Sequence, residues 1–194
     1  NTVTKSGTNE WKGSVYWYMK SPGLEGLRQK DVKVDKGDFQ ENHYGLSVGG
    51  PIIKNKLFFF INGEMDRIST PINYRPRPDK NTPIENTNYS YADEKTLQEL
   101  ADFLQENFDY NPGSYNVKNS PTEANRITAR VDWNIDARNS LSVKYFYLKS
   151  FTTNNPSTSG AMTGGRGPNA NAIPFSSSYY RANNNFNIIM ADLN

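Results

Sequence analysis

One run of residues past the middle of the chain alternates without exception between polar and apolar side chains. From Arg126 to Asp136 every even position is polar, and the odd positions carry Ile127, Ala129, Val131, Trp133 and Ile135. Successive side chains of a β-strand point to opposite faces, so this period of two predicts a strand with one apolar and one polar face. The run is too regular in its period of two for a helix, and we expect the fold to be built around a sheet.

Five further segments show the same pattern, at about residues 11–20, 38–50, 56–68 and 141–149, and from Tyr179 towards the end of the chain. Each is predicted to be a strand with one apolar face. The residues expected on these faces are Trp11, Gly13, Val15, Trp17 and Met19; Tyr44, Leu46 and Val48; Leu57, Phe59, Ile61 and Met65; Leu141, Val143, Tyr145 and Tyr147; and Phe186, Ile188 and Met190.

The predicted strands are joined by connections of alternating length. Gly49, Gly50 and Pro51 predict a tight reversal at residues 51–56, because glycine permits a positive φ and proline fixes its own φ and donates no ladder hydrogen bond. A second short turn is expected at 136–140, and the segments 21–37, 69–124 and 150–177 are long. Short turns at one end and long loops at the other are typical of outer-membrane barrels, whereas a β-sandwich does not require them.

The longest of these connections contains a predicted helix. Ser90 to Asp93 is consistent with a capping box, and Leu97, Leu100, Ala101, Leu104 and Phe108 recur at helical spacing. Pro112 and Gly113 then end the element. We expect an amphipathic helix at 91–108 and no strand in the rest of 69–124.

Composition supports a membrane barrel over a soluble domain. Only 35% of the 194 residues are hydrophobic, yet 13% are aromatic, and the mean hydropathy is −0.80. A barrel reconciles these values because its strands are apolar on alternate residues only and its lumen is polar. No apolar run is long enough for a transmembrane helix. The balance of 22 basic and 20 acidic residues offers no field for nucleic acid.

Two motifs resemble a known family. Residues 3–14, Val-Thr-Lys-Ser-Gly-Thr-Asn-Glu-Trp-Lys-Gly-Ser, resemble the junction between plug and barrel in TonB-dependent outer-membrane receptors. Residues 43–52, followed by Lys-Leu-Phe-Phe-Phe at 56–60, resemble the second and third barrel strands of the Oar-like members, which are related to the SusC and RagA type. The resemblance covers about the first third of the chain.

The resemblance implies an architecture. Residues 1–10 would be the end of the plug domain and a linker, and 11–194 the first strands of the barrel. The fold would be all-β, about six antiparallel strands of a larger transmembrane barrel with long extracellular loops, one of them holding a short helix. The chain would then be an internal fragment of a longer protein.

The resemblance also implies a function. The protein would import an unidentified nutrient across the outer membrane of a Gram-negative bacterium of the Bacteroidota type, using energy delivered by TonB. Its partners would be outer-membrane lipid, the remainder of its own plug and barrel, TonB and a surface lipoprotein, but not nucleic acid. Two alternatives stay open: an outer-membrane barrel that acts as a structural or assembly partner in a surface complex, and a secreted β-sandwich that serves as a binding module.

Two sets of residues are candidates for the functional faces. Arg126, Arg130, Asp132 and Asp136 would face the lumen, either as a solute path or plug-docking surface or, the interpretation we favour, as an ordinary wet wall. Lipid-facing and girdle positions would be held by Trp17, Tyr44, Val131, Trp133 and Tyr147, with Tyr180 at the outer interface and Trp11 beside Trp133 at the periplasmic one.

The chain offers few parts for catalysis or metal binding. His43 is the single histidine and there is no cysteine, so neither a Ser/His/Asp nor a Cys/His arrangement can be assembled. Asp31, Asp35 and Asp38 lie near Gly37, but their spacing is not that of a known calcium loop. We therefore expect no enzyme activity, no cofactor and no metal.

Overall fold

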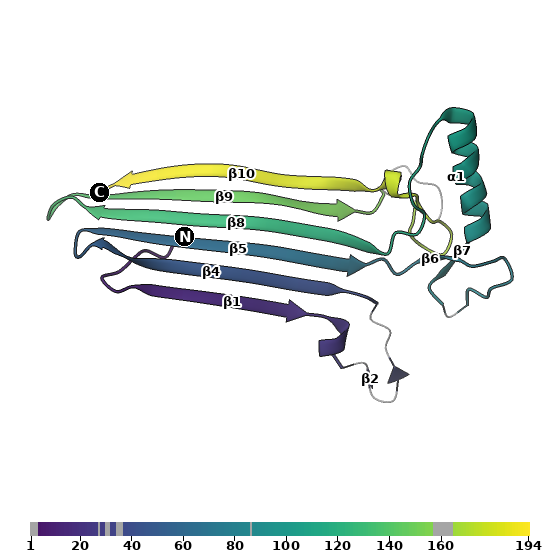
Figure 1. Ribbon diagram of the computed structural model, residues 1–194, viewed down its shortest axis with the longest axis horizontal. Coiled ribbons are helices and arrows are strands. Elements are labelled where there is room, and N and C mark those ends of the chain that lie inside the picture. The colour runs from purple at the N-terminus through teal and green to yellow at the C-terminus, as the bar shows by residue number, and fades with distance from the viewer. Residues whose placement is uncertain (1–3, 27, 30–31, 34–36, 86, 157–164) are drawn as a thin grey trace.

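The computed structural model describes residues 4–26, 28–29, 32–33, 37–85, 87–156 and 165–194. Six long strands lie side by side in one antiparallel sheet, and their spatial order follows the chain (Figure 1). They are β1 (Lys12–Lys20), β4 (Gln40–Ile53), β5 (Leu57–Pro71), β8 (Asn119–Asn134), β9 (Ser140–Asn154) and β10 (Tyr180–Leu193). The sheet is open, with β1 and β10 at its edges.

The sheet is a single layer. Apart from prolines, Leu97 and Ala124 are the only apolar side chains that are buried among the described residues, and neither belongs to a core between layers. A β-sandwich packs two sheets face to face and buries the side chains between them. The sandwich alternative is therefore wrong for this fold. No helix in the described part of the chain combines the length and apolarity needed to cross a membrane.

The tight turns gather at one end of the sheet and the long connections at the other (Figure 1). The short helices η1 (Pro22–Leu24) and η2 (Ser176–Ser178), the strand pairs β2 (Arg28–Gln29) with β3 (Val32–Lys33) and β6 (Arg75–Arg77) with β7 (Tyr89–Asp93), and α1 (Glu94–Phe108) all belong to the long connections. The predicted alternation of connection lengths is confirmed. The prediction of no strand in 69–124 is wrong, because β6, β7 and the start of β8 lie there.

Several strands extend beyond their predicted ends. β8 begins at Asn119 rather than 126, and β5 and β9 run on to Pro71 and Asn154. Backbone pairing continues from Ile68↔Thr122 to Pro71↔Asn119, in a stretch with no alternating apolar residues to reveal it. At its other end β8 stops at Asn134, because the side chain of Asp136 accepts hydrogen bonds from the backbone N–H groups of Arg138 and Asn139 and closes the turn.

The reversal between β4 and β5 lies within the predicted range 51–56 but occupies only its second half. Gly49, Gly50 and Pro51 lie within β4, and the turn is formed by Lys54 to Lys56. Asn55 adopts the left-handed conformation there, with φ 63°, and the N–H of Lys56 bonds to the carbonyl of Ile53 at 3.0 Å. Asparagine tolerates this region better than most residues, so it takes the role that the sequence pattern assigned to glycine.

Helix α1 begins later than predicted. Its N-cap is Asp93, whose carboxylate accepts from the backbone N–H of Thr96 at 3.0 Å and from the Thr96 hydroxyl at 2.9 Å. Ser90, which the sequence suggested as the cap, lies in β7 and donates to the carbonyl of Ala170 at 2.9 Å. The helix ends at Phe108, followed by Asp109 in the left-handed conformation.

The strand register assigns every strand residue to one of two faces. The Arg126 face carries the even-numbered residues of β8, and the Val131 face carries the odd-numbered ones. The pairs Val131↔Val143 and Val143↔Ala191 place the odd residues of β10 on the Val131 face. Phe186, Ile188, Met190 and Tyr180 therefore lie on the Arg126 face, and their assignment to the apolar face was wrong. Because β10 has apolar side chains on both sides, its sequence could not decide between them.

Candidate functional site: the Arg126 face and the N-terminal segment

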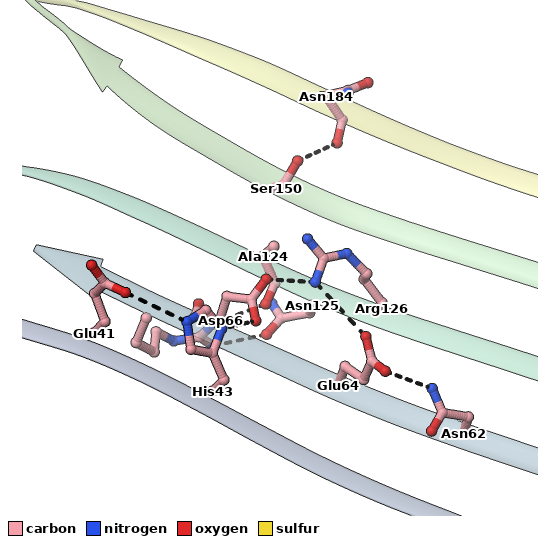
Figure 2. Close-up of polar contacts among 11 residues, drawn as sticks. Glu41, His43, Asn62, Glu64, Asp66, Ala124, Asn125, Arg126, Ser150 and Asn184 are labelled. Atoms are coloured by element: carbon pink, nitrogen blue, oxygen red, sulfur yellow. Dashed lines mark hydrogen bonds and ion pairs between the residues drawn. The ribbon is translucent and has the colours of Figure 1, made fainter. Parts of the chain in front are cut away.

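A cluster of charged and polar side chains occupies the part of the Arg126 face near the long connections (Figure 2). Asp66 of β5 is its centre: one carboxylate oxygen accepts from His43 Nδ1 of β4 at 2.7 Å, and the other accepts from Arg126 Nη1 of β8. Arg126 also lies 3.9 Å from Glu64, and Glu41 lies 4.0 Å from His43 Nε2. The cluster thus links three neighbouring strands through the hydrogen bonds that Asp66 accepts.

A second group of ion pairs lies nearer the tight turns. Arg130 forms a close pair with Asp132, its Nη2 at 2.7 Å from Oδ1, and Lys144 of β9 pairs with Asp192 of β10 at 2.7 Å. Arg126, Arg130 and Asp132 therefore share one face, as the sequence predicted. Asp136 does not join them, because it lies beyond β8 in the turn.

The N-terminal segment, residues 4–10, packs against the Arg126 face. Arg130 Nη1 donates to the carbonyl of Thr4 at 2.8 Å and to its hydroxyl at 3.0 Å. Five residues later, Asn9 binds the β4–β5 turn, where Asn55 N–H donates to Asn9 Oδ1 at 2.7 Å. Along the chain, the segment therefore runs across the sheet from β8, at Thr4, to the β4–β5 turn, at Asn9, and then enters β1.

Gly7 lets this segment approach the sheet closely. It lies over the paired residues Gly50 and Phe59. Gly50 has no side chain and the Phe59 side chain points to the Val131 face, so no side chain lies between Gly7 and the backbone of the sheet. A Cβ at this position would stand 2.3 Å from the carbonyl oxygen of Phe59 and 2.9 Å from that of Gly50. No other residue fits without a shift of backbone, which explains why a glycine stands here.

The Val131 face is apolar between two rows of aromatic side chains. Trp17 stacks on Tyr44 with 6.2 Å between ring centroids, and its Nε1 donates to Asn42 at 3.1 Å. At the tight-turn end Trp11 meets Phe59 edge to face at 5.3 Å, and Trp133 pairs with Leu57. Val131 and Tyr147 share this face, so all five girdle and lipid-facing candidates fall on one side of the sheet.

The two long connections at the far end are joined to each other. Backbone N–H groups of Ser176 and Ser177 bond to the carbonyls of Ser114 and Pro112 at 2.8 and 3.1 Å, and Tyr91 N–H bonds to Ala170 at 2.7 Å. Between α1 and residues 111–116 lies an open groove of about 430 Å³, lined by polar groups that include Gln98 and Asp102. No pattern in the sequence indicated this union of loops.

The comparisons with known proteins agree with this architecture. The family model described as "Outer membrane beta barrel domain" matches residues 3–189. The chain belongs to this family. The TonB-dependent transporter Oar of Myxococcus xanthus is 41% identical over 66 residues, which are 31% of this chain and 6% of that protein. No solved structure matches the chain significantly.

Membership of the outer membrane beta barrel family places the protein in the outer membrane, as the resemblance implied. It also gives the open sheet its context, because the six strands form part of a barrel wall. The chain spans only a small part of the transporter that it matches.

Metal ligands do not gather in the described part of the chain, where no three His, Cys, Asp or Glu side chains are placed to hold one ion. Asp31 and Asp35, considered above as calcium ligands, lie outside the described residues. His43 is engaged with Asp66 and, by ring contact at 5.8 Å, with Tyr18. Its geometry is that of a member of the polar cluster.

Sequence reasoning missed three residues that organise this site. Asp66 looked like one polar position among many, and Thr4 and Asn9 looked like parts of a linker. Their partners Arg126, Arg130 and Asn55 are 60, 126 and 46 residues away along the chain. The sequence features that could have indicated this packing were Gly7 and Asn9 of the junction motif, because a flexible connector does not require these residue types.

Proposed function

We propose that this chain is the end of the plug and the first wall segment of a TonB-dependent outer-membrane transporter that imports a nutrient. Residues 1–10 would close the plug domain and lead into the barrel, and 11–194 would supply its first strands. The observation that carries the proposal is the packing of residues 4–10 against the Arg126 face, held by Arg130 at one end and Asn55 at the other.

This packing supports the assignment of the Arg126 face as an inner face. A chain segment that leaves a barrel wall and lies against it must be inside the barrel or in the lipid. Residues 4–10 are polar, with Lys, Ser, Thr and Asn side chains that would be costly to bury in hydrocarbon. The Arg126 face is therefore proposed as the lumen wall, with Arg126, Arg130 and Asp132 directed to water, and the Val131 face as the lipid surface.

The dimensions of the Val131 face support this assignment. On β5 its apolar positions run from Leu57 to Met65, and the next residue on that face is Arg67, which bonds to Asn125 at 2.8 Å. Eight steps of about 3.4 Å, tilted by about 40°, cover about 21 Å of height, close to the apolar band of roughly 25 Å in outer-membrane barrels. Trp17 and Tyr44 stand at its upper limit, where amphipathic rings favour the interface.

The proposed partners follow from this setting. The Val131 face would contact outer-membrane lipid, the edges of β1 and β10 would pair with the rest of the barrel, and TonB would act on the plug. A surface lipoprotein could meet the joined loops around α1. The transporter name of the Oar relative supports energy coupling and import. We propose no enzyme activity, since Asp66 is bonded to both His43 and Arg126 and none of the three is free for catalysis.

Nutrient depletion tests the proposed function and identifies the substrate in the same experiment. The producing bacterium, a deletion of this gene and a strain depleted of TonB are grown in defined medium, and the remaining solutes are measured by mass spectrometry. We expect at least one solute to persist in both mutant cultures and to be consumed by the parent. If the deletion strain consumes every solute as the parent does, while surface complexes are lost, the structural and assembly role is the better account.

A further inference from the structure

A basic group lies at the outer rim of the Val131 face, on β9 and β10. The apolar run of β9 on this face ends at Tyr147, and the next two residues there are Lys149 and Phe151. The register with β9 places Arg181 of β10 on the same face, and both cations are exposed. The two strands lie side by side, and these residues are close to their long-connection ends (Figure 1). We name Lys149, Phe151 and Arg181 the β9–β10 rim.

Phe151 draws the Arg181 guanidinium towards Lys149. Arg181 pairs in register with Thr153, four residues beyond Lys149, yet its Cζ lies 3.7 Å from the centre of the Phe151 ring. A guanidinium over an aromatic face is held by cation–π attraction. Phe151 follows Lys149 by two residues on the same face, which is about 7 Å along the strand. The contact therefore brings the Arg181 charge back along the sheet to the level of the residue next to Lys149.

Neither cation of the rim is neutralised within the described part of the chain. No hydrogen bond or ion pair there holds the Lys149 ammonium group, and Arg181 is held by the Phe151 ring alone. Glu123 of β8 faces Phe151 across the β8–β9 pair, but its carboxylate lies 3.6 Å from Arg67 Nε, on the β5 side. The rim therefore carries two positive charges that no described carboxylate balances.

An amide donor lies beside the two cations. Asn185 of β10 pairs with Lys149 and is exposed on the same face. Its Oδ1 accepts from the backbone N–H of Ser150 at 3.1 Å, which leaves Nδ2 as the donor that a ligand can meet. Cations and amide donors without a competing carboxylate suit an oxyanion, because charge-assisted hydrogen bonds to its oxygens are strong.

The location of the rim points to the source of this oxyanion. With the Val131 face proposed to lie against lipid, the rim stands where hydrocarbon gives way to headgroups, at the level of the lipid phosphates. Basic side chains at a membrane surface attract anionic lipids, and a lysine at the apolar edge extends its stem along the hydrocarbon while its ammonium group reaches the headgroups. The β9 residues of the Val131 face that precede the rim are Leu141, Val143, Tyr145 and Tyr147.

We propose that the β9–β10 rim binds the phosphate of an anionic lipid headgroup, between the Lys149 ammonium group and the Arg181 guanidinium, with Asn185 Nδ2 as a further donor. The proposal rests on the proposed function, which makes the Val131 face the lipid surface of the barrel. It adds one charge-selective lipid site to a face that otherwise offers lipid apolar and aromatic contacts.

Fluorescence quenching in the full-length receptor tests this site. A bimane fluorophore is attached to Asn183→Cys, an exposed position of β10 that pairs with Phe151, in a receptor without other cysteines. The receptor is reconstituted in phosphatidylcholine, and either phosphatidylglycerol or phosphatidylcholine with a spin label at the top of the acyl chain is added. We expect stronger quenching by the spin-labelled phosphatidylglycerol, and the ratio of the two measures the preference of the rim for an anionic headgroup.

Substitutions in the rim should lower this preference. Lys149→Gln and Arg181→Gln are each expected to lower it about fivefold. Phe151→Leu keeps both charges but removes the ring that holds Arg181, so it should lower the preference as well. Lys144→Gln, on the Arg126 face of the same strand, is the matched control and should leave the preference unchanged. The heat-modifiable folded band checks that each variant folds.

The other outcomes overturn the proposal in recognisable ways. Equal quenching by the two lipids means that the rim meets lipid without selecting charge. A preference that survives loss of both charges means that anionic lipid is held by other residues. Relief of quenching by inorganic phosphate, but not by sodium chloride of equal ionic strength, means that the rim takes a soluble phosphate. None of these results bears on nutrient depletion, so the lipid site can fail while the transport proposal holds.

Discussion

Asn9 and Asn55 bind each other across 46 residues of sequence by two hydrogen bonds. The side-chain amide of Asn9 donates to Asn55 Oδ1 at 2.5 Å, and the backbone N–H of Asn55 donates to Asn9 Oδ1 at 2.7 Å. Asn55 holds a left-handed conformation at the centre of the β4–β5 turn. The pair therefore fixes the segment that precedes β1 to the most tightly bent point of the adjoining hairpin.

Asn9→Ala is expected to loosen this attachment without unfolding the barrel. Each hydrogen bond of this kind contributes about 0.5–1.5 kcal/mol, and a change of about 1.4 kcal/mol shifts an equilibrium tenfold. A cysteine at Ser6 in the full-length receptor then becomes more reactive towards maleimide, while the heat-modifiable folded band is retained. Lys54→Ala, in the same turn but with an exposed side chain, provides the control. Equal protection of Ser6→Cys in both variants would show that the Asn pair does not hold the segment.

Gly7→Val is expected to displace residues 4–8 from the sheet. The added Cβ would stand 2.3 Å from the carbonyl oxygen of Phe59, and the surrounding atoms belong to backbone that is fixed by its ladder. Gly63→Val is the matched control, because a Cβ at Gly63 meets nothing within 4 Å. Trypsin cleavage after Lys5 in the folded receptor should increase for Gly7→Val alone. Similar cleavage of both variants would contradict the close contact.

The strands could be predicted where one face is apolar and the other polar. Val131 and Trp133 alternate with Arg130 and Asp132, so a period of two was visible without a structure. The same signal is absent where strands rise above the apolar band, as at Ser120 and Thr122, since both faces are polar there. It also fails at β10, where Ile188 and Ile189 are apolar on opposite faces and only the register with β9 distinguishes them.

The candidate site was harder to predict because it depends on pairings between distant strands. The alternation around Arg126 predicted a polar face, but nothing near it in the sequence indicated Asp66 as its partner. The cap of α1 shows a more local failure: Ser90 and Asp93 are both good N-cap residues, and the choice of Asp93 follows from the contact of Ser90 with Ala170, which lies in another loop.

Asp93→Ala is expected to fray the first turn of α1, and Ser90→Ala to leave it intact. The pKa of Asp93 is lowered, chiefly by the hydrogen bond from the backbone N–H of Thr96. A carboxyl with a lowered folded pKa stabilises the fold fully above its unfolded value of 3.8, and this contribution is lost as pH falls through the folded value. The long connection that holds α1 should therefore be cleaved by protease faster in Asp93→Ala than in the parent at pH 7. The difference in cleavage rate should shrink below about pH 4.

Val131→Arg is expected to impair folding of the receptor, and Asn62→Arg to be tolerated. A charge on the lipid face near the bilayer centre costs about 2–4 kcal/mol in outer-membrane barrels. Asn62 lies on the Arg126 face, where its side chain bonds to Glu64 at 3.2 Å, so an arginine there would gain a carboxylate neighbour. The fraction of heat-modifiable folded protein in detergent measures the folding of both variants. Equal folding of the two variants would mean that the Val131 face does not meet lipid.

The end of the sheet that carries α1 is expected to face the outside of the cell. Long loops of outer-membrane barrels are extracellular and short turns periplasmic. Lys54 and Asn155 are both exposed, at the tight-turn and long-connection ends, and this chain contains no cysteine to interfere. In a full-length receptor without other cysteines, an impermeant maleimide added to intact cells should label Asn155→Cys and spare Lys54→Cys. Permeabilised cells should show both labelled, which controls for reactivity. Labelling of Lys54→Cys alone in intact cells would reverse the orientation of the sheet in the membrane, and with it the position of α1 and the joined loops.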